Sequence, residues 1–340
     1  METGFWKCPT AELQTDPLLI ITNVVTCFSL VLNIALLVII SLLRGTAKIF
    51  LVHLRALTVS VIFYNFIELC NLTISPHLFP TDSFLAPTLC HAWRSDYLTN
   101  SFYYFGALIL NVIVSNRAVQ LACKYPYAFS NSLAADLAYV VGMGLISIIV
   151  MLPQALLVHW NGKRCLCLDT HLPYIVVVSL YAETFVRFGL AVLLSGISLS
   201  ISCYKIINWV RSTPAEQLVD NWNSLAFHHT TQDQIEEFSR PQGWMTASMC
   251  IIPLSVNYLA VSILRIGYEF TCAVGFCKIM PQSLLARLID LLIHLQMLAL
   301  PIIISVYIPS VQHLLLTFCR RLTSICRKPI TREDLDSRTS

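Results

Sequence analysis

Seven apolar stretches, each long enough to cross a lipid bilayer, constrain the fold of this 340-residue chain more than any other feature. Roughly 20 apolar residues in a helix match a hydrocarbon layer about 30 Å thick. The backbone finds no water at that depth, so each stretch must close its own hydrogen bonds as a helix. The sequence predicts an all-α integral membrane fold, a bundle of seven transmembrane helices. The predicted spans are Leu18–Leu43, Ile49–Leu69, Tyr97–Leu121, Leu133–Val158, Tyr181–Val210, Met245–Ile266 and Leu284–Ser310.

The charged residues predict how the chain is oriented. Glu2, Glu12 and Asp16 precede the first span, whereas Arg44 and Lys48 follow it. Lys and Arg accumulate on the cytoplasmic side of membrane proteins, and an extracellular N-terminus places most of the 22 Lys and Arg residues inside. We therefore expect a multi-pass plasma-membrane protein with its N-terminus outside.

The segments between and around the spans define the expected domains. Residues 1–17 form an extracellular N-terminus, and residues 18–311 form the membrane domain. Residues 211–243, between spans five and six, are polar and are expected to be solvated and partly disordered, with helical extensions of their neighbours. Residues 312–340 combine an amphipathic helix with a cytoplasmic tail. This helix is expected to lie on membrane lipids, with its basic side chains at the headgroups.

Several cysteines and one asparagine are candidate modification sites. Cys319 and Cys326 lie beside basic residues after the last span and are candidates for palmitoylation, or else unmodified thiols. Cys90, Cys165 and Cys167 fall on the predicted outer side, where disulfides form. Asn71 begins an Asn-Leu-Thr sequon, so it is a glycosylation candidate, although it lies close to the bilayer. The β-branched run 175–178 is expected to pair as a hairpin strand over the bundle mouth.

Short motifs at particular depths resemble those of rhodopsin-like (class A) G-protein-coupled receptors. Asn33 lies in Leu-Asn-Ile-Ala-Leu-Leu-Val, Arg117 in Ser-Asn-Arg-Ala, and Pro253 in Cys-Ile-Ile-Pro. Pro309 falls where the family has Asn-Pro-x-x-Tyr, and Tyr204 matches a family tyrosine. Each motif is degraded, and the resemblance is closest to lineage-expanded invertebrate orphan and peptide receptors.

The resemblance implies roles for these residues. Asn116, Arg117 and Tyr204 would face an inner cavity that couples to a heterotrimeric G protein. Asn33, Cys250, Pro253 and Pro309 would serve the conformational switch, with Pro253 kinking the middle of span six. Cys90 would pair with either Cys165 or Cys167. Asn116 stands where the family has an acidic residue, and Val61 stands where it has the sodium-binding Asp.

Polar residues at the outer ends of the spans are the candidate ligand site, because charges at that depth are costly and often functional. Glu183 and Arg187 are one helical turn apart and are expected to pair. Arg265 lies with Glu269 at the outer end of span six. The candidate ligand-binding residues are Tyr97, Thr99, Glu183, Arg187, Arg265, Asp290 and His294. A short peptide fits this mixed charge best, and a small chemosensory ligand is the alternative.

Other classes of function are disfavoured or left open. No nucleophile–base pair, paired carboxylates or metal-ligand cluster lies within the spans, so we expect no enzyme activity, no metal and no cofactor. No basic run interleaved with aromatics indicates nucleic acid. A seven-helix transporter and a non-signalling membrane protein remain as alternatives.

Overall fold

The fold is described from a computed structural model, which covers residues 17–45, 47–73, 85–122, 132–162, 165–168, 172–214, 218, 220–228, 230–239, 245–277 and 283–326. The predicted N-terminal segment and the end of the predicted tail lie mostly outside these ranges.

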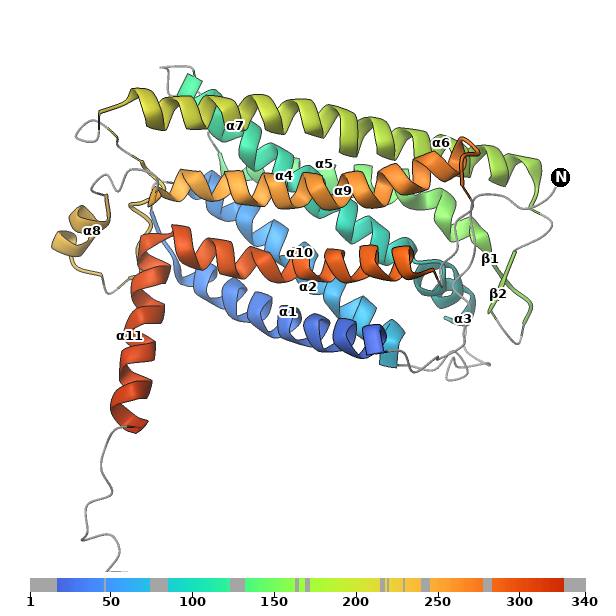
Figure 1. Cartoon of the computed structure of the whole chain (residues 1–340), viewed down its shortest axis with the longest axis horizontal. Coiled ribbons are helices and arrows are strands. Elements are labelled where there is room, and N and C mark those ends of the chain that lie inside the picture. The colour runs from blue at the N-terminus through green and yellow to red at the C-terminus, as the bar shows by residue number, and fades with distance from the viewer. Residues whose placement is uncertain are drawn as a thin grey trace, which may run out of the picture.

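Seven helices in the described ranges are long and apolar enough to cross a membrane, which confirms the predicted fold class. Several spans combine more than one helical segment (Figure 1). Span four continues from an α-helix into a 3₁₀ turn, span five contains a π-helical stretch, and span six starts as a 3₁₀ turn. In chain order the spans are α1 (Pro17–Leu42), α2 (Lys48–Thr73), α4 (Tyr97–Ala122), α5 (Leu133–Met151) with η3 (Leu152–Leu157), α6 (Tyr174–Arg187) with η4 (Phe188–Leu194) and α7 (Ser195–Ser212), η7 (Ala247–Cys250) with α9 (Ile251–Ala273), and α10 (Leu284–Tyr307).

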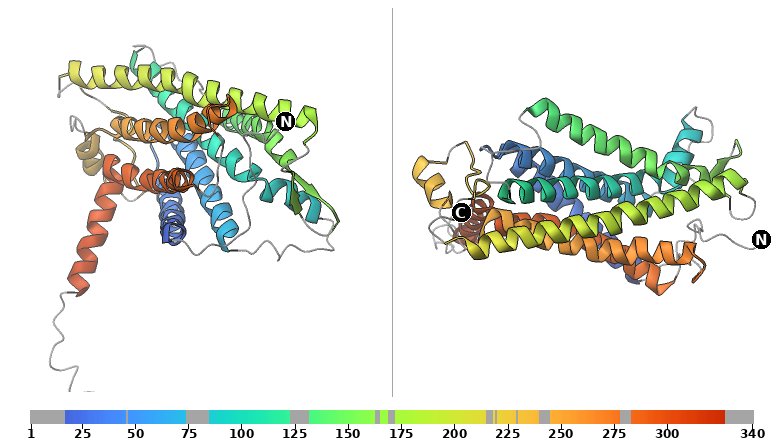
Figure 2. Two further views of the ribbon diagram at one scale, coloured as in Figure 1. Left: turned by 45° about the vertical axis from the view of Figure 1, so that its right-hand side comes forward. Right: turned by 90° about the horizontal axis from the view of Figure 1, so that it is seen from above.

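Smaller elements mark the two ends of the bundle (Figure 1). At one end lie α3 (Ala86–Leu89), η2 (Cys90–Arg94) and the antiparallel hairpin of β1 (Val158–Trp160) and β2 (Cys165–Cys167). At the other lie α8 (Gln232–Ser239) and α11 (Pro309–Cys326), and α11 turns away across the direction of the spans (Figure 2). We name the hairpin end the outer end, following the side that the charge distribution predicts.

The burial pattern is that of a bundle solvated by lipid. On α1 the polar side chains of Thr26, Ser29 and Asn33 are buried, while Phe28 and Val31 are more than 60% exposed. Apolar side chains gain nothing from burial when the solvent is itself apolar, so polar groups occupy the helix contacts. Asn33 donates from Nδ2 to the carbonyl of Met297 in α10 at 3.2 Å, the expected contact with a neighbouring helix.

The predicted strand at residues 175–178 is wrong. This run forms the first turns of α6, directly after Pro173 at the helix N-cap, and the hairpin uses residues 158–160 and 165–167 instead. Apolar β-branched residues are compatible with a helix when the surroundings are lipid. The helix satisfies every backbone group within the segment, which an open strand edge cannot do in a bilayer.

Two prolines stand elsewhere than predicted. Pro253 is the third residue of α9, after the 3₁₀ turn, rather than the centre of a span. Pro309 opens α11, and the seventh span already ends at Tyr307. Proline is tolerated in the first turn of a helix because the N–H that it lacks has no intrahelical partner there. The proline inside span seven is Pro301, which the motif comparison missed.

Candidate functional site

Six polar side chains form a closed chain of contacts near the outer end of the bundle, and we name it the outer polar ring. It joins four spans: the third, fourth, fifth and sixth. In order around the ring the residues are Glu183, Arg187, Glu269, Arg265, Asn100 and Gln154.

Arg187 is the most tightly held member of the ring. Its Nε lies 2.5 Å from Glu183 Oε1, and its Nη2 lies 2.7 Å from Glu269 Oε2. The Arg187 and Glu183 side chains are only 7% and 2% exposed. The Glu183–Arg187 pair is therefore formed as the sequence predicts, and Glu269 adds a second carboxylate from α9. Because removing one partner leaves an uncompensated buried charge, such a group strongly fixes helix positions.

The other half of the ring uses neutral amides. Arg265 Nε lies 3.6 Å from Glu269 Oε1, and its Nη2 donates to Asn100 Oδ1 at 2.6 Å. Asn100 Nδ2 donates to Gln154 Oε1 at 2.5 Å, and Gln154 Nε2 donates to Glu183 Oε1 at 3.1 Å. The ring thus balances two guanidinium groups against two carboxylates.

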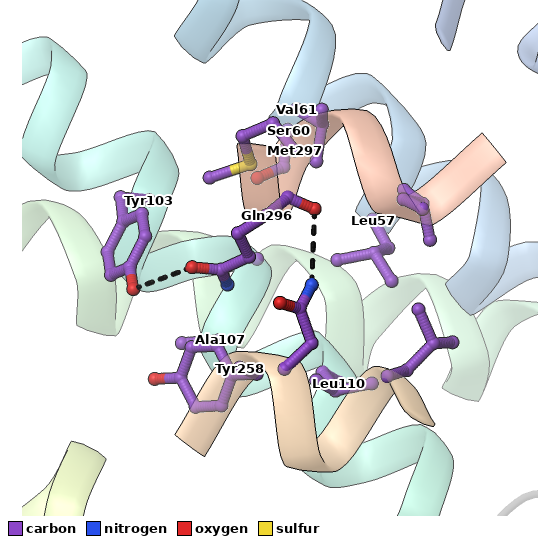
Figure 3. A pocket seen from close by; sticks show the side chains of 13 residues that line it. Leu57, Ser60, Val61, Tyr103, Ala107, Leu110, Tyr258, Gln296 and Met297 are labelled. Carbon is purple, nitrogen blue, oxygen red and sulfur yellow. Dashed lines mark hydrogen bonds between the residues drawn. The ribbon is translucent and has the colours of Figure 1, made fainter. Parts of the chain in front are cut away.

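Tyr103 connects this ring to the middle of the bundle. The Arg265 guanidinium lies 5.1 Å from the centre of the Tyr103 ring, a cation–π distance. The Tyr103 hydroxyl lies 3.2 Å from Ser262 Oγ and donates to Gln296 Oε1 at 3.4 Å (Figure 3). One tyrosine on α4 therefore contacts both α9 and α10.

A small cavity of about 50 Å³ lies beside Tyr103, between α2, α4, α9 and α10. Asn257 Nδ2 donates across it to the carbonyl of Gln296 at 3.4 Å (Figure 3). Val61, which the motif comparison aligns with a sodium-binding residue, lines this cavity with Ser60. The volume suffices for a few water molecules but falls well short of the several hundred Å³ of a small-molecule site.

A disulfide joins the hairpin to the helical turn that precedes the third span. Cys90, in η2, is bonded to Cys165, in β2, and this selects one of the two partners that the sequence left open. The side chain of Cys167 lies outside the described part of the chain. A second disulfide, Cys272–Cys277, closes the turn after α9.

At the opposite, inner end, Arg117 is the centre of a second polar cluster. Its side chain is only 5% exposed. Nε donates to Ser248 Oγ at 2.7 Å, Nη1 to Gln120 Oε1 at 3.3 Å, and Nη2 to Asp220 Oδ1 at 2.9 Å. Arg117 is thus paired with a carboxylate that comes from the loop between spans five and six, rather than from its own helix.

This loop is not solvated throughout, contrary to the expectation for residues 211–243. Asp220, Trp222 and Asn223 are at most 3% exposed. The prediction failed because polar residues in a loop usually face water, whereas here they bind backbone and side-chain groups at the inner ends of the spans. By contrast, α8 in the same loop has no buried residue.

Asp220 and Asn223 also cap the sixth span. Ser248 N donates to Asp220 Oδ2 at 2.8 Å, and Ala247 N donates to Asn223 Oδ1 at 2.7 Å. Thr246, at the N-cap position, makes no side-chain capping bond. A helix N-terminus has unpaired N–H groups and attracts negative charge. The loop therefore supplies the capping groups that the helix itself does not.

The remaining predicted site residues are dispersed. Tyr204 is 65% exposed and so lies apart from the buried cluster around Arg117, contrary to its expected place in the inner cavity. Asn116 and Cys250 are buried near Arg117, on the third and sixth spans. Asn71 lies in the last turn of α2, and Cys319 is exposed on α11.

Four predicted ligand-binding residues lie outside the outer polar ring. The Tyr97 hydroxyl donates to the carbonyl of Ile148 at 3.2 Å, toward span four. His294 Nδ1 lies 3.0 Å from Thr26 Oγ1, toward span one. Asp290 is exposed and Thr99 is buried within α4. Of the predicted ligand-binding residues, Glu183, Arg187 and Arg265 therefore come together in the outer polar ring, whereas Tyr97 and His294 contact other helices.

Asn100, Gln154 and Asp220 are the site residues that sequence reasoning missed. Asn100 and Gln154 had a signal, because amides near the ends of apolar spans need partners. Asp220 had no such signal, since its role depends on how the loop folds back onto Arg117 and the start of the sixth span. Comparison with known proteins finds no protein-family model and no curated protein that matches this chain.

Proposed function

We propose that this chain is a rhodopsin-like G-protein-coupled receptor of the plasma membrane, with an extracellular N-terminus. Its ligand would bind beside the outer polar ring, and a heterotrimeric G protein would bind at the inner end. The supporting observation is the path of contacts from Arg265 through Tyr103 to Gln296, which links the ring to the third, sixth and seventh spans. A ligand that changes the partners of Arg265 would alter how these spans pack.

A short peptide is the ligand class that the ring favours. The ring contains two guanidinium groups and two carboxylates at short distance. A peptide carries both an ammonium and a carboxylate, so it can compete for either type of partner with charge-assisted hydrogen bonds. Such a ligand shifts the receptor only by its different affinity for the two packings of the spans.

At the inner end, Arg117 is the residue that we assign to the G protein. Arg117 is a buried cation near the inner end of α4, and it donates to Ser248 of η7, at the start of the sixth span. A helix of the partner would enter between the spans, the mode by which many helical ligands bind grooves.

The test uses the purified chain in lipid nanodiscs with a mixture of Gα subtypes and Gβγ. Peptide libraries are screened for stimulation of guanine-nucleotide exchange. Arg117→Ala is expected to abolish stimulation and leave peptide binding within about threefold, a change below 1 kcal/mol. Lys205→Ala is the control, because Lys205 is an exposed cation on α7.

Two results would contradict the proposal. Peptide-stimulated exchange that is equal in Arg117→Ala and the wild type would remove the G-protein role of Arg117. Solute or ion flux through liposomes containing the pure chain, with no exchange on any Gα, would instead indicate a transporter.

A further inference from the structure

The loop segment that carries Asp220 fills the inner end of the bundle, and we name residues 218 and 220–227 the inner plug. Leu218, Trp222 and Leu225 are at most 3% exposed and belong to the main hydrophobic core, together with side chains of the spans. A loop that contributes to a membrane domain's core is bound to it, so the inner mouth behaves as a binding site with an occupant from the same chain.

An ion pair between Asp220 and Arg117 holds the plug against the spans. Asp220 Oδ1 accepts hydrogen bonds from Arg117 Nη2 and, at 3.0 Å, from the backbone N of Trp222 in the same loop. Asp220 Oδ2 accepts a hydrogen bond from the backbone N of Ser248. One carboxylate thus contacts the third span, the sixth span and the loop itself. The residue next to Arg117 in its motif is Asn116, which carries no charge. Asp220 therefore supplies the negative charge that neutralises Arg117.

The plug also binds by aromatic stacking. The rings of Trp222 and Phe50 are 3.7 Å apart between centroids and inclined by 12°. The Arg117 guanidinium lies 5.0 Å from the centre of the Trp222 ring, a cation–π distance. Trp222 therefore contacts both an aromatic side chain of span two and the cation of span three.

The end of the plug is tied to the connection between spans one and two. Arg44 and Ala226 exchange two backbone hydrogen bonds, each 2.9 Å long, as an isolated antiparallel bridge. Leu225 packs so closely there that a Cβ on Gly45 would come within 2.9 Å of its Cδ2. With this bridge the plug spans the inner mouth from α1 to η7.

We propose that the inner plug is an autoinhibitory segment, which occupies the inner mouth as an intramolecular ligand and must leave before a cytosolic partner reaches Arg117. The identity of that partner as a G protein rests on the proposed function. The plug holds Ala247 and Ser248, the first residues of the sixth span. Movement of this end away from Arg117 breaks those bonds, so plug release and span movement favour each other.

The test compares four purified proteins in nanodiscs: the wild type, Asp220→Asn, Trp222→Ala and Asp233→Asn. Asp233 is an exposed aspartate of α8 in the same loop, which makes it the matched control. Hydrogen–deuterium exchange is measured at residues 220–227 and 247–250. We expect exchange at least about tenfold faster in Asp220→Asn and Trp222→Ala than in the wild type and the control, as for local opening of a protected segment. Ligand-free nucleotide exchange on G protein should rise in the same two variants.

The outcomes separate the two proposals. Equal hydrogen exchange in all four proteins would overturn the docked plug. A second outcome is faster hydrogen exchange in Asp220→Asn and Trp222→Ala without a rise in their ligand-free activity. If peptide still stimulates the wild type, this outcome would overturn the inhibitory role of the plug. Faster hydrogen exchange without G-protein activation in any protein would sustain the docked plug and contradict the receptor function instead.

Discussion

Arg117 and Asp220 are 103 residues apart in the sequence and 2.9 Å apart in the structure, with side chains that are 5% and 0% exposed. One is in a membrane-spanning helix and the other is in a loop. A buried ion pair adds little net stability, but loss of one partner leaves a charge that nothing compensates. The pair therefore acts to fix the position of the loop, and its role is conformational.

The outer polar ring predicts a large effect on stability. Arg187→Ala leaves Glu183 and Glu269 without their shared cation, and we expect it to cost about 3–5 kcal/mol, as for other buried pairs from which one partner is removed. Arg187→Lys should lose less, since a single ammonium keeps the charge but cannot reach both carboxylates with the same geometry. Thermal unfolding in nanodiscs measures both variants. The exposed Lys205→Ala is the control, and a midpoint for Arg187→Ala equal to the control would refute this assignment.

The two disulfides in the part of the chain that the structure describes should differ in their contribution to stability. Cys90 and Cys165 are separated by 75 residues, whereas Cys272 and Cys277 are separated by 5. In the chain-entropy model the longer loop contributes about 4 kcal/mol and the shorter one about 2 kcal/mol. Replacing both cysteines of each bond with serine should therefore lower the unfolding midpoint more for the Cys90–Cys165 pair. The reverse order would show that loop closure is not what these bonds contribute.

The carboxyl of Asp96, which precedes the third span, should make the stability of the fold depend on pH. Burial raises the pKa of its carboxyl to about 6, and the charge of Arg265 offsets this only in part. The folded state then holds its proton at a higher pH than the unfolded state, so stability rises as the pH falls from 7 to 5. Asp96→Asn should lose this component. Asparagine also tolerates the positive φ of 57° at this position.

The measurement for Asp96 is the unfolding midpoint of both proteins at pH 7 and pH 5. The variant should be more stable than the wild type at pH 7, and the difference should shrink at pH 5. A constant difference across this range would contradict the raised pKa.

The sequence was sufficient for the seven spans because the length and apolarity of each span follow directly from the thickness of a bilayer. It also predicted the Glu183–Arg187 pair, since residues one turn apart on a helix are neighbours whatever the tertiary fold. The prediction of a strand at residues 175–178 was wrong because β-branched residues form helices readily in lipid. The placement of Pro309 within the seventh span was wrong because the motif fixes a spacing along the chain and not the residue at which the helix ends.

The contacts between distant segments could not be predicted from the sequence. Nothing in the sequence near Asp220 indicates that the loop folds back onto Arg117, because the pair depends on the packing of three spans and a bridge to Arg44. The closing contacts of the outer polar ring, from Asn100 through Gln154, likewise depend on how the third and fourth spans meet.

The orientation of the chain in the membrane is the central claim, because both proposals need the outer polar ring outside the cell and Arg117 facing the cytosol. Epitope tags at Met1 and Ser340 are stained on intact cells and again after permeabilisation. The account predicts that intact cells stain only for the tag at Met1 and that permeabilised cells stain for both. Staining of the Ser340 tag on intact cells would contradict it.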